Sequence, residues 1–398
     1  MKIFLLTPIY ATTTSMQGAT PLVHYFAKEW VALGNEVHII HLVAHYPKLY
    51  YYVARRFQHQ LNSRLGQLVP TEEPKRYEAE YDGVKVHGIT LNKIRPHSRY
   101  KKAQLDKAVG FITGLCDAYG VPDIFVGHWD NPQLELLNLL KAIFSKPTAL
   151  VLHNNDFQLE ATYGEDTKKL LSNIDKIGFR SIGAKEKFER LFGPVPNSFM
   201  AFSGVSSDFI DAGVRLADFE RQLDSFIYTG SLISRKHPKV VVDSLKTVYG
   251  EDSFNLVYVG NGAEQEAIEI ENQKLIEEGR VVFAGRIPRG EVIKWLQKAQ
   301  VFVMISEREV FGLVYLEAMA LGLIPIGTRG EGIDGIIRDG ENGFLCKAGD
   351  KEELDQIIKK LRNLPTADLQ RISRNARQTA QSFSDREVAK EYLKSISK

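Results

Sequence analysis

Short apolar runs alternate along the chain with longer segments whose apolar residues have helical spacing. Lys2–Thr7 and Glu36–Val43 have the composition of buried strands, and Pro21–Leu33 has the spacing of a helix that ends before Gly34. Similar strands are expected at Asp123–Gly127, Ala149–His153 and Lys176–Ser181. Because continuous apolar strands need helices on both faces, this half of the chain is predicted to form a covered parallel sheet.

The same pattern starts again near residue 225. Five further strands are expected, at Phe226–Thr229, Asn255–Val259, Val281–Ala284, Val301–Ile305 and Leu323–Ile326. Helices are expected at Pro238–Tyr249, Ala263–Glu278 and Arg289–Ala299. The polar stretch Arg215–Asp224 is the expected hinge between two α/β domains. Such a pair is expected to bind ligands in a cleft, at the carboxyl ends of its strands.

The composition excludes several classes of protein. The 398 residues are enough for two to three domains at roughly 150 residues each. Cys116 and Cys346 are too few and too far apart for a disulfide framework or a structural zinc site, which favours a reducing compartment. Met1–Pro8 is too short an apolar segment for a signal peptide, and no run approaches the ~18 apolar residues of a membrane span. A cytoplasmic protein is therefore expected.

Positive charge is concentrated at one end of the chain. Residues 1–110 hold 15 Lys and Arg against 8 Asp and Glu, although the whole chain has a net charge of only +2, and this asymmetry disfavours a nucleic-acid partner. Two basic stretches, Tyr46–Gln60 and Lys93–Lys107, are rich in aromatic side chains. They suit reversible docking on anionic lipid headgroups at the inner membrane face, with a solvated helical face as the alternative.

The strongest chemical signal is Ser306–Gly322, which follows the expected strand Val301–Ile305. Gly312 is predicted to open a helix, and the free amides near Phe311, Gly312 and Leu313 can hold an anion such as a phosphate. Glu309 precedes the helix and Glu317 lies within it, where their carboxylates can accept hydrogen bonds from the hydroxyls of a sugar and a ribose. The alternative is that Glu309 is a first-turn acid and Glu317 a solvated helix position. The apolar neighbours of Glu317 argue against the latter, because an unpaired buried charge is costly.

The pattern Glu309-x7-Glu317, with Phe311-Gly312 inside it, resembles the retaining glycosyltransferases of GT-B fold and GT4 type. Further matching segments are Phe226–Ser231 with Lys236, Val257–Gly262, Val282–Arg286, Ala318–Gly322 and Gly340–Leu345. The resemblance implies two Rossmann-like domains facing across a cleft. Residues 1–215, with about 382–398, would form the acceptor-binding domain, and residues 222–381 the nucleotide-sugar-binding domain. The last helix would cross back to the first domain.

The resemblance also implies a donor site. Glu309 would contact hydroxyls of the donor sugar and Glu317 the ribose, while Lys236 would pair with the diphosphate, whose charge grows as the glycosidic bond breaks. The remaining implied donor-binding residues are Gly230, Ser231, Gly260, Arg286, Ile287, Val310, Phe311, Gly312 and Leu313. Arg286 and Ile287 would lie beside the nucleobase.

One position departs from the family pattern. Ser231 stands where the family usually has an arginine. We hypothesise that Arg235, next to Lys236, supplies the second cation, with a solvated loop residue as the alternative.

In the N-terminal half the resemblance implies a catalytic histidine, His153, at a strand end, alongside Glu309 and Lys236. Implied acceptor-binding residues are Gly18, Ala19, His128 and Asp156. The alternative is that both histidines are structural. In that interpretation Trp129 and Asp130, which follow His128, are a packed side chain and a helix cap.

The implied reaction is transfer of a hexosyl unit, with retention, from a nucleotide diphosphate sugar to a hydroxyl of a glycan or lipid-linked acceptor in surface polysaccharide biosynthesis. A UDP-sugar is expected by analogy, and neither a cofactor nor a metal ion is needed. One alternative is a nucleotide-sugar 2-epimerase or an inverting GT-B transferase, which the Glu309-x7-Glu317 spacing disfavours. Another is a catalytically silent nucleotide-sugar-binding partner subunit, which Ser231 favours.

Overall fold

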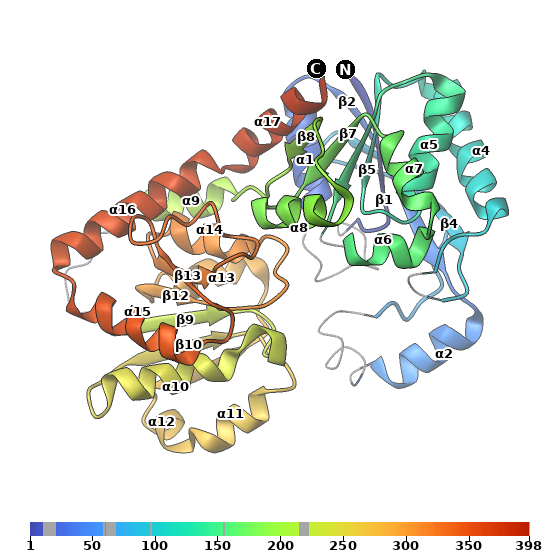
Figure 1. Ribbon diagram of the computed structural model, residues 1–398. Helices are drawn as coiled ribbons and strands as arrows, with labels where there is room; N and C mark the ends of the chain where they lie inside the picture. The colour runs from blue at the N-terminus through green and yellow to red at the C-terminus, as the bar shows by residue number, and fades with distance from the viewer. Residues whose placement is uncertain are drawn as a thin grey trace. The chain divides into compact units, whose positions relative to one another are not determined.

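The computed structural model describes residues 1–10, 21–58, 60, 69–95, 98–153, 156–214 and 223–397. The chain forms two compact units, in each of which helices pack around one sheet (Figure 1). The first unit consists of Met1–Arg180, Ala184–Phe202 and Val388–Lys398, and the second of Ser181–Gly183 and Ser203–Glu387. The chain therefore builds most of the first unit, then the second, and returns to the first.

The first unit contains an eight-stranded sheet. In spatial order its strands are β3 (Tyr77–Tyr81), β4 (Val84–Asn92), β2 (Glu36–His45), β1 (Lys2–Thr7), β5 (Ile124–His128), β6 (Thr148–Leu152), β7 (Lys176–Phe179) and β8 (Ser198–Met200). Neighbouring strands pair in parallel except β3 with β4. Its helices are α1 (Leu22–Ala32), α2 (Lys48–Arg56), α4 (Lys102–Tyr119), α5 (Gln133–Phe144), α6 (Asp156–Tyr163), α7 (Asp166–Ser172), most of α8 (Ile182–Phe192) and the end of α17 (Asp385–Ser397). Phe4 of β1 and Phe125 of β5 are fully buried in the core between the sheet and these helices.

The second unit contains a six-stranded, entirely parallel sheet. In spatial order its strands are β11 (Val281–Gly285), β10 (Asn255–Val259), β9 (Ser225–Thr229), β12 (Val301–Val303), β13 (Ile324–Thr328) and β14 (Phe344–Cys346). Its helices are α9 (Ser207–Val214), the 3-10 helix η2 (Ser234–Lys236), α10 (Pro238–Tyr249), α11 (Gln265–Glu271), α12 (Gln273–Glu277), α13 (Arg289–Leu296), α14 (Leu313–Ala320), α15 (Lys351–Asn363), α16 (Thr366–Ser382) and the start of α17. This is the doubly wound order 3-2-1-4-5-6, in which ligands bind where the order reverses, here between β9 and β12.

The expected strands are present, with small shifts at their ends. The single helix expected over Ala263–Glu278 is instead two helices, α11 and α12, which meet at Asn272. The side-chain amide of Asn272 donates to the Ile268 carbonyl, 2.8 Å away, so it bonds the backbone at the point where the helix breaks. The antiparallel hairpin β3–β4 was not expected, although Asp82-Gly83 at its turn has the positive φ values of a hairpin turn.

The boundary between the units lies earlier than residue 215, where it was expected. Helix α9 packs against α14 and α16 of the second unit. The contact is close, because a Cβ on Gly213 would lie 1.8 Å from the Ala320 carbonyl oxygen. Most of the expected hinge, residues 215–222, lies outside the described residues.

The end of the chain completes the first unit, as expected. The Trp30 indole donates to the Ala389 carbonyl at 2.9 Å, and the Tyr392 ring packs edge-on to Trp30 with a centroid distance of 4.9 Å. The return begins at Val388, within α17, rather than at residue 382.

Candidate active site

The expected donor-binding residues of the second unit follow the carboxyl ends of four neighbouring parallel strands. Gly230 and Ser231 follow β9, Gly260 follows β10, Arg286 and Ile287 follow β11, and the loop 306–312 follows β12. These strand ends lie at one edge of the sheet, and two of them flank the point where the strand order reverses. The expected placement at strand ends is confirmed. The role of each residue in binding stays a prediction.

The ends of β9 and β10 touch through two glycines. Gly260 has φ +134, and a Cβ there would lie 2.0 Å from the Gly230 carbonyl oxygen. The Gly230 N–H also donates to the Val259 carbonyl at 2.9 Å. Because no side chain fits at residue 260, the backbone at this edge stays open to close approach by a ligand.

Lys236 and Glu309 form an ion pair across the switch point. The Nζ of Lys236, on η2, lies 3.0 Å from Oε2 of Glu309, in the loop before α14, and the two side chains are only 13% and 17% exposed. The Ser306 hydroxyl donates to the same carboxylate oxygen at 3.4 Å. Partial burial reduces screening by water, so this pair is held more strongly than an exposed one. The predicted diphosphate-binding cation and the predicted sugar-binding carboxylate are therefore direct neighbours.

Further contacts tie η2 to the same loop. The Glu307 N–H donates to the Arg235 carbonyl at 2.7 Å, and the Arg235 guanidinium donates back to the Glu307 carbonyl at 3.1 Å. His237 Nε2 lies 3.2 Å from the Glu307 carboxylate. The Arg235 side chain thus reaches the loop that carries Glu309. Ser231, where the family has arginine, accepts the Tyr228 hydroxyl at its carbonyl at 3.0 Å.

The positive end of α14 adjoins this ion pair in the sequence. Gly312 precedes the helix with φ +76, and a Cβ there would lie 2.6 Å from the Tyr315 ring. The Tyr315 N–H donates to the Gly312 carbonyl at 2.9 Å, and its hydroxyl donates to the Met304 carbonyl. Val310 and Leu313 are half-buried and Phe311 is buried. The amides of Leu313 and Val314, which precede Tyr315 in the first turn, are placed where a helix N-terminus binds an anion.

Glu317 lies in α14 with only 6% of its surface exposed. It is surrounded in sequence by buried residues, Tyr315–Ala320. The alternative interpretation of Glu317 as a solvated helix position is therefore wrong.

A third carboxylate at this edge was missed in the sequence. Oε2 of Glu331 accepts the backbone N–H of Glu309 at 3.0 Å, while the Gly332 N–H donates to the Glu309 carbonyl at 3.0 Å. A Cβ on Gly332 would lie 2.5 Å from Cα of Phe311, so the two loops are in close contact. The segment 331–332 thus holds the backbone of Glu309 from both sides. An acid between two glycines just after a strand, Gly330-Glu331-Gly332, was the available signal.

In the first unit, the two predicted histidines contact each other. His128 ends β5 and His153 follows β6, with His128 Nδ1 3.1 Å from His153 Nε2. His128 Nε2 lies 3.1 Å from the Tyr392 hydroxyl. Burial, together with the charge of Arg180, holds the pKa of both histidines well below the usual range, so both rings are neutral at pH 7.

Trp129 stacks on His153 with a ring-centroid distance of 3.9 Å and an interplanar angle of 13°. His128 is fully buried with a partner at each ring nitrogen, so it holds His153 rather than presenting a surface to an acceptor. The structural alternative therefore describes His128 better than direct acceptor contact. Gly18 and Ala19 lie outside the described residues, and so does the side chain of Asp156, which begins α6.

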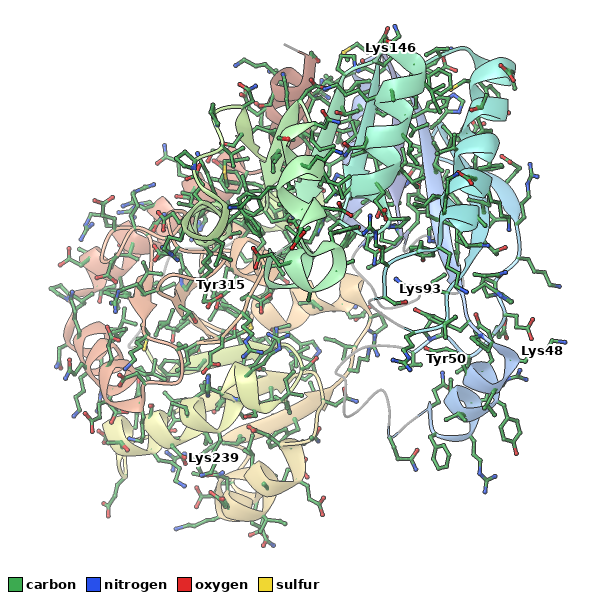
Figure 2. The ribbon with its side chains drawn as sticks, turned by 45° about the vertical axis from the view of Figure 1, so that its right-hand side comes forward. Lys48, Tyr50, Lys93, Lys146, Lys239 and Tyr315 are labelled. Atoms are coloured by element: carbon green, nitrogen blue, oxygen red, sulfur yellow. The ribbon has the colours of Figure 1, made fainter. Side chains whose placement is uncertain are left out.

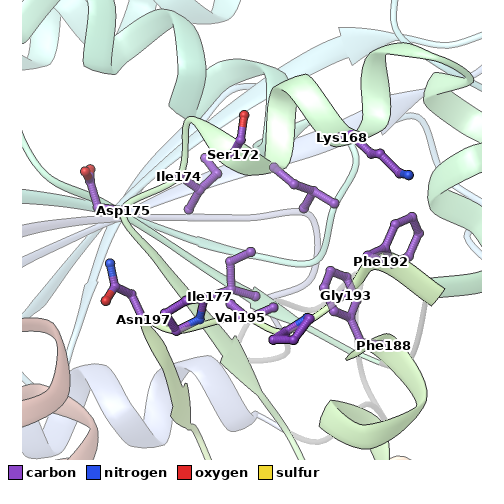
Figure 3. A pocket seen from close by; sticks show the side chains of 13 residues that line it. Lys168, Ser172, Ile174, Asp175, Ile177, Phe188, Phe192, Gly193, Val195 and Asn197 are labelled. Carbon is purple, nitrogen blue, oxygen red and sulfur yellow. The ribbon is translucent and has the colours of Figure 1, made fainter. Parts of the chain in front are cut away.

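A cavity of about 390 Å³ lies elsewhere in the first unit. It is lined by residues of α7, β7, α8 and the segment 193–197, including Ile177, Phe188 and Asn197, and by none of the predicted site residues (Figure 3). Within the described ranges, no three His, Cys, Asp or Glu side chains gather as metal ligands would. In the same ranges no helix combines the length and the apolar character needed to span a bilayer.

Comparison with known proteins places the second unit in a family. Residues 219–379 match the family model described as glycosyl transferases group 1. The chain is 37% identical over 129 residues to N-acetyl-alpha-D-glucosaminyl L-malate synthase of Bacillus anthracis, which covers 32% of this chain and 33% of that protein. It is 25% identical over 293 residues to an uncharacterized glycosyltransferase of Methanocaldococcus jannaschii, covering 72% and 77% of the two chains.

Residues 219–379 belong to the group 1 glycosyltransferases. Solved structures match over the whole chain. Sucrose-phosphate synthase from Thermosynechococcus elongatus superposes with a TM-score of 0.67 at 18% identity, covering 99% and 98% of the two chains. Anabaena HepE in complex with UDP superposes with a TM-score of 0.67 at 17% identity, covering 100% of each chain. These likenesses show that the group 1 glycosyltransferase unit is the second half of a GT-B fold, as expected.

Proposed function

We propose that this protein is a retaining hexosyltransferase that moves a hexosyl unit from a nucleotide diphosphate sugar to a hydroxyl of a glycan or lipid-linked acceptor. The observation that carries the proposal is the Lys236–Glu309 pair at the switch point, immediately before the N-terminus of α14. Together with Glu317, this edge offers a cation and helix amides for a diphosphate and carboxylates for the hydroxyl groups on either side of it. A role in surface polysaccharide biosynthesis is supported by relatives named for lipopolysaccharide core and capsular polysaccharide biosynthesis, in Rhizobium meliloti and Staphylococcus aureus.

In this proposal the leaving group is stabilised by fixed positive charge. The bond from the anomeric carbon to the phosphate oxygen breaks, and negative charge develops on the diphosphate. Lys236, Arg235 and the amides of Phe311–Leu313 would stabilise it. Because these groups supply the charge that a divalent ion would otherwise provide, the reaction is proposed to be metal-independent.

Retention follows from attack on the same face that the diphosphate leaves. The acceptor hydroxyl forms the new bond to the anomeric carbon, and its proton passes to an oxygen of the departing nucleoside diphosphate. No protein nucleophile is needed. Glu309 would accept hydrogen bonds from hydroxyls of the donor sugar, and His153 would act as a neutral hydrogen-bonding group, consistent with the pKa lowered by burial.

The proposed donor is a UDP-sugar. Anabaena HepE, which shares the fold, has been solved with UDP and with UDP-glucose. The deciding experiment is calorimetric titration with UDP, GDP and ADP without metal, followed by NMR of the anomeric configuration in the product. Preferential UDP binding and a retained anomer are expected. Inversion, or activity that disappears with a chelator and returns with magnesium, would contradict the mechanism.

A second candidate is a catalytically silent nucleotide-sugar-binding partner subunit, favoured by Ser231 in the place of arginine. Tight UDP binding without turnover on any acceptor would support it. The location proposed for the enzyme is the cytoplasm, with reversible docking on the inner membrane face, which the basic N-terminal stretch supports.

A further inference from the structure

Helix α2 has apolar side chains on two faces. Tyr51 and Ala54 are buried against the first unit. On the outer side, Leu49, Tyr52, Val53 and Phe57 are 71%, 65%, 42% and 45% exposed. Their spacing of three, four and eight residues places them in one stripe along the helix. Single exposed apolar residues are ordinary, whereas three on one short helix with a fourth at its C-cap mark an interaction site.

The inner face of the helix is fixed by aromatic contacts. The Tyr51 hydroxyl accepts the Tyr46 N–H at 3.0 Å, and the ring centroids of Tyr46 and Tyr50 lie 4.5 Å apart. Figure 2 shows the side chain of Tyr50 on this helix. Burial raises the pKa of the Tyr46 phenol to about 12. Because this cluster holds the helix, its outer stripe is presented in a defined orientation.

The helix itself is basic, and the nearby Glu73 carboxylate approaches it on the side of Tyr51 and His45. Lys48, Arg55 and Arg56 are exposed on the helix, and no Asp or Glu occurs in the chain between Glu36 and Glu72. Ile94, 66% exposed, and the exposed Arg95 continue the same character just after β4. They lie at the same end of the sheet, since the Lys93 N–H donates at 2.9 Å to the carbonyl of His45, the last residue of β2.

We infer that the outer face of α2 docks on an anionic lipid bilayer. Leu49, Tyr52, Val53 and Phe57 enter the boundary between headgroups and acyl chains, while Lys48, Arg55 and Arg56 contact lipid phosphates. Charge complementarity selects this partner, because α2 exposes Lys48, Arg55 and Arg56 and contains no Asp or Glu. A helix of nine residues is also too small for a stable protein interface, which buries roughly 800 Å² on each partner.

The test is flotation of the full chain with vesicles. Vesicles of equimolar phosphatidylcholine and phosphatidylglycerol should recruit the protein at low salt, and vesicles of phosphatidylcholine alone should not. The double variant L49Q/V53Q should lose binding. The double variant R55Q/R56Q should partition about 25-fold more weakly, at roughly fivefold per charge.

The matched control is I143Q/L191Q, which changes two apolar residues of α5 and α8 that are 54% and 61% exposed. It should bind the vesicles like the wild type. Thermal melts followed by circular dichroism check that each variant folds.

Three results would overturn the inference. They are failure of the wild type to bind anionic vesicles, wild-type binding by L49Q/V53Q, and a vesicle-independent dimer that L49Q/V53Q abolishes. The last would assign the face to a second copy of the chain. The inference deepens the membrane docking in the proposed function, yet UDP titration tests the donor site separately, so the two failures are distinguishable.

Discussion

Lys236 and Glu309, 73 residues apart in sequence, form a mostly buried ion pair with Nζ 3.0 Å from Oε2. In the proposed reaction both groups bind the donor, the lysine through the diphosphate and the carboxylate through sugar hydroxyls. The donor must therefore replace part of an interaction that the protein already makes with itself. Without a bound donor, Lys236 and Glu309 neutralise each other's charge, and their ion pair fixes the loop before α14.

We expect Glu309→Gln to separate nucleotide binding from transfer. The neutral amide competes less with a diphosphate for Lys236, so UDP should bind roughly threefold or more tightly. Sugar transfer should fall, because the amide replaces a carboxylate acceptor. Calorimetry with UDP and single-turnover kinetics measure the two effects, and weaker UDP binding would contradict the competition.

The two neighbouring cations of η2 can be compared directly. Lys236→Ala should weaken UDP binding by roughly 10- to 100-fold, which corresponds to the loss of one charge-assisted hydrogen bond. Arg235→Ala should weaken it by a similar factor if Arg235 replaces the arginine missing at Ser231. If Arg235→Ala kept its UDP affinity and turnover while Lys236→Ala lost them, Arg235 would be a solvated loop residue with no role in donor binding.

Glu331 is expected to position Glu309 rather than contact the nucleotide. Glu331→Ala removes the acceptor for the Glu309 N–H and should lower kcat about tenfold, with UDP affinity unchanged. Glu331→Gln keeps an acceptor oxygen and should restore most of kcat. Glu341→Ala is the control, because the exposed Glu341 carboxylate forms an ion pair with Arg338, three residues away. Loss of UDP binding in Glu331→Ala would contradict the positioning role.

Gly260→Ala tests the close approach at the strand ends. The new Cβ would meet the Gly230 carbonyl at 2.0 Å, and backbone cannot move aside cheaply. A loss of about 3 kcal/mol or more in the free energy of unfolding is expected. Gly279, with φ +71, also has a positive φ, but a Cβ there meets nothing within 4 Å, so Gly279→Ala should cost only about 1–2 kcal/mol. Equal losses in denaturant titrations would refute the steric argument.

Acid should destabilise the first unit through its buried histidines. Burial lowers the pKa of His128 and His153 in the folded state, and lowers that of His41 to about 4. The unfolded chain therefore binds more protons below pH ~6.5, and stability falls as pH decreases from there, by up to about 1.4 kcal/mol per pH unit for each histidine. Urea unfolding across this range should show the slope, and His128→Gln should reduce it. An unchanged slope would count against burial as the cause.

Much of the fold follows from the sequence because most strands are continuous apolar runs. The hairpin β3–β4 was missed because Tyr77–Tyr81 alternates half-buried with exposed residues and includes two glutamates. The sequence also predicted Glu309, Glu317 and Lys236 as site residues from their motif, and their roles in binding stay predictions.

Contacts between distant segments are not encoded in a local pattern. The Lys236–Glu309 pairing joins the ends of two strands, and Glu331 acts on backbone rather than on a side chain. The stretch Tyr46–Gln60 was recognised as basic and aromatic. Only the structure separates the buried Tyr51 from the exposed Tyr52 on its helix.

The packing of Tyr392 against Trp30 and its contact with His128 constrain the order of events during synthesis. The first unit lacks part of its core until residues 388–397 have left the ribosome, after the whole second unit has emerged. The N-terminal sheet therefore remains partly uncovered beside α1 while the second unit folds. Nascent chains arrested before and after Tyr392 would differ in protease resistance at the first unit, with no difference at the second.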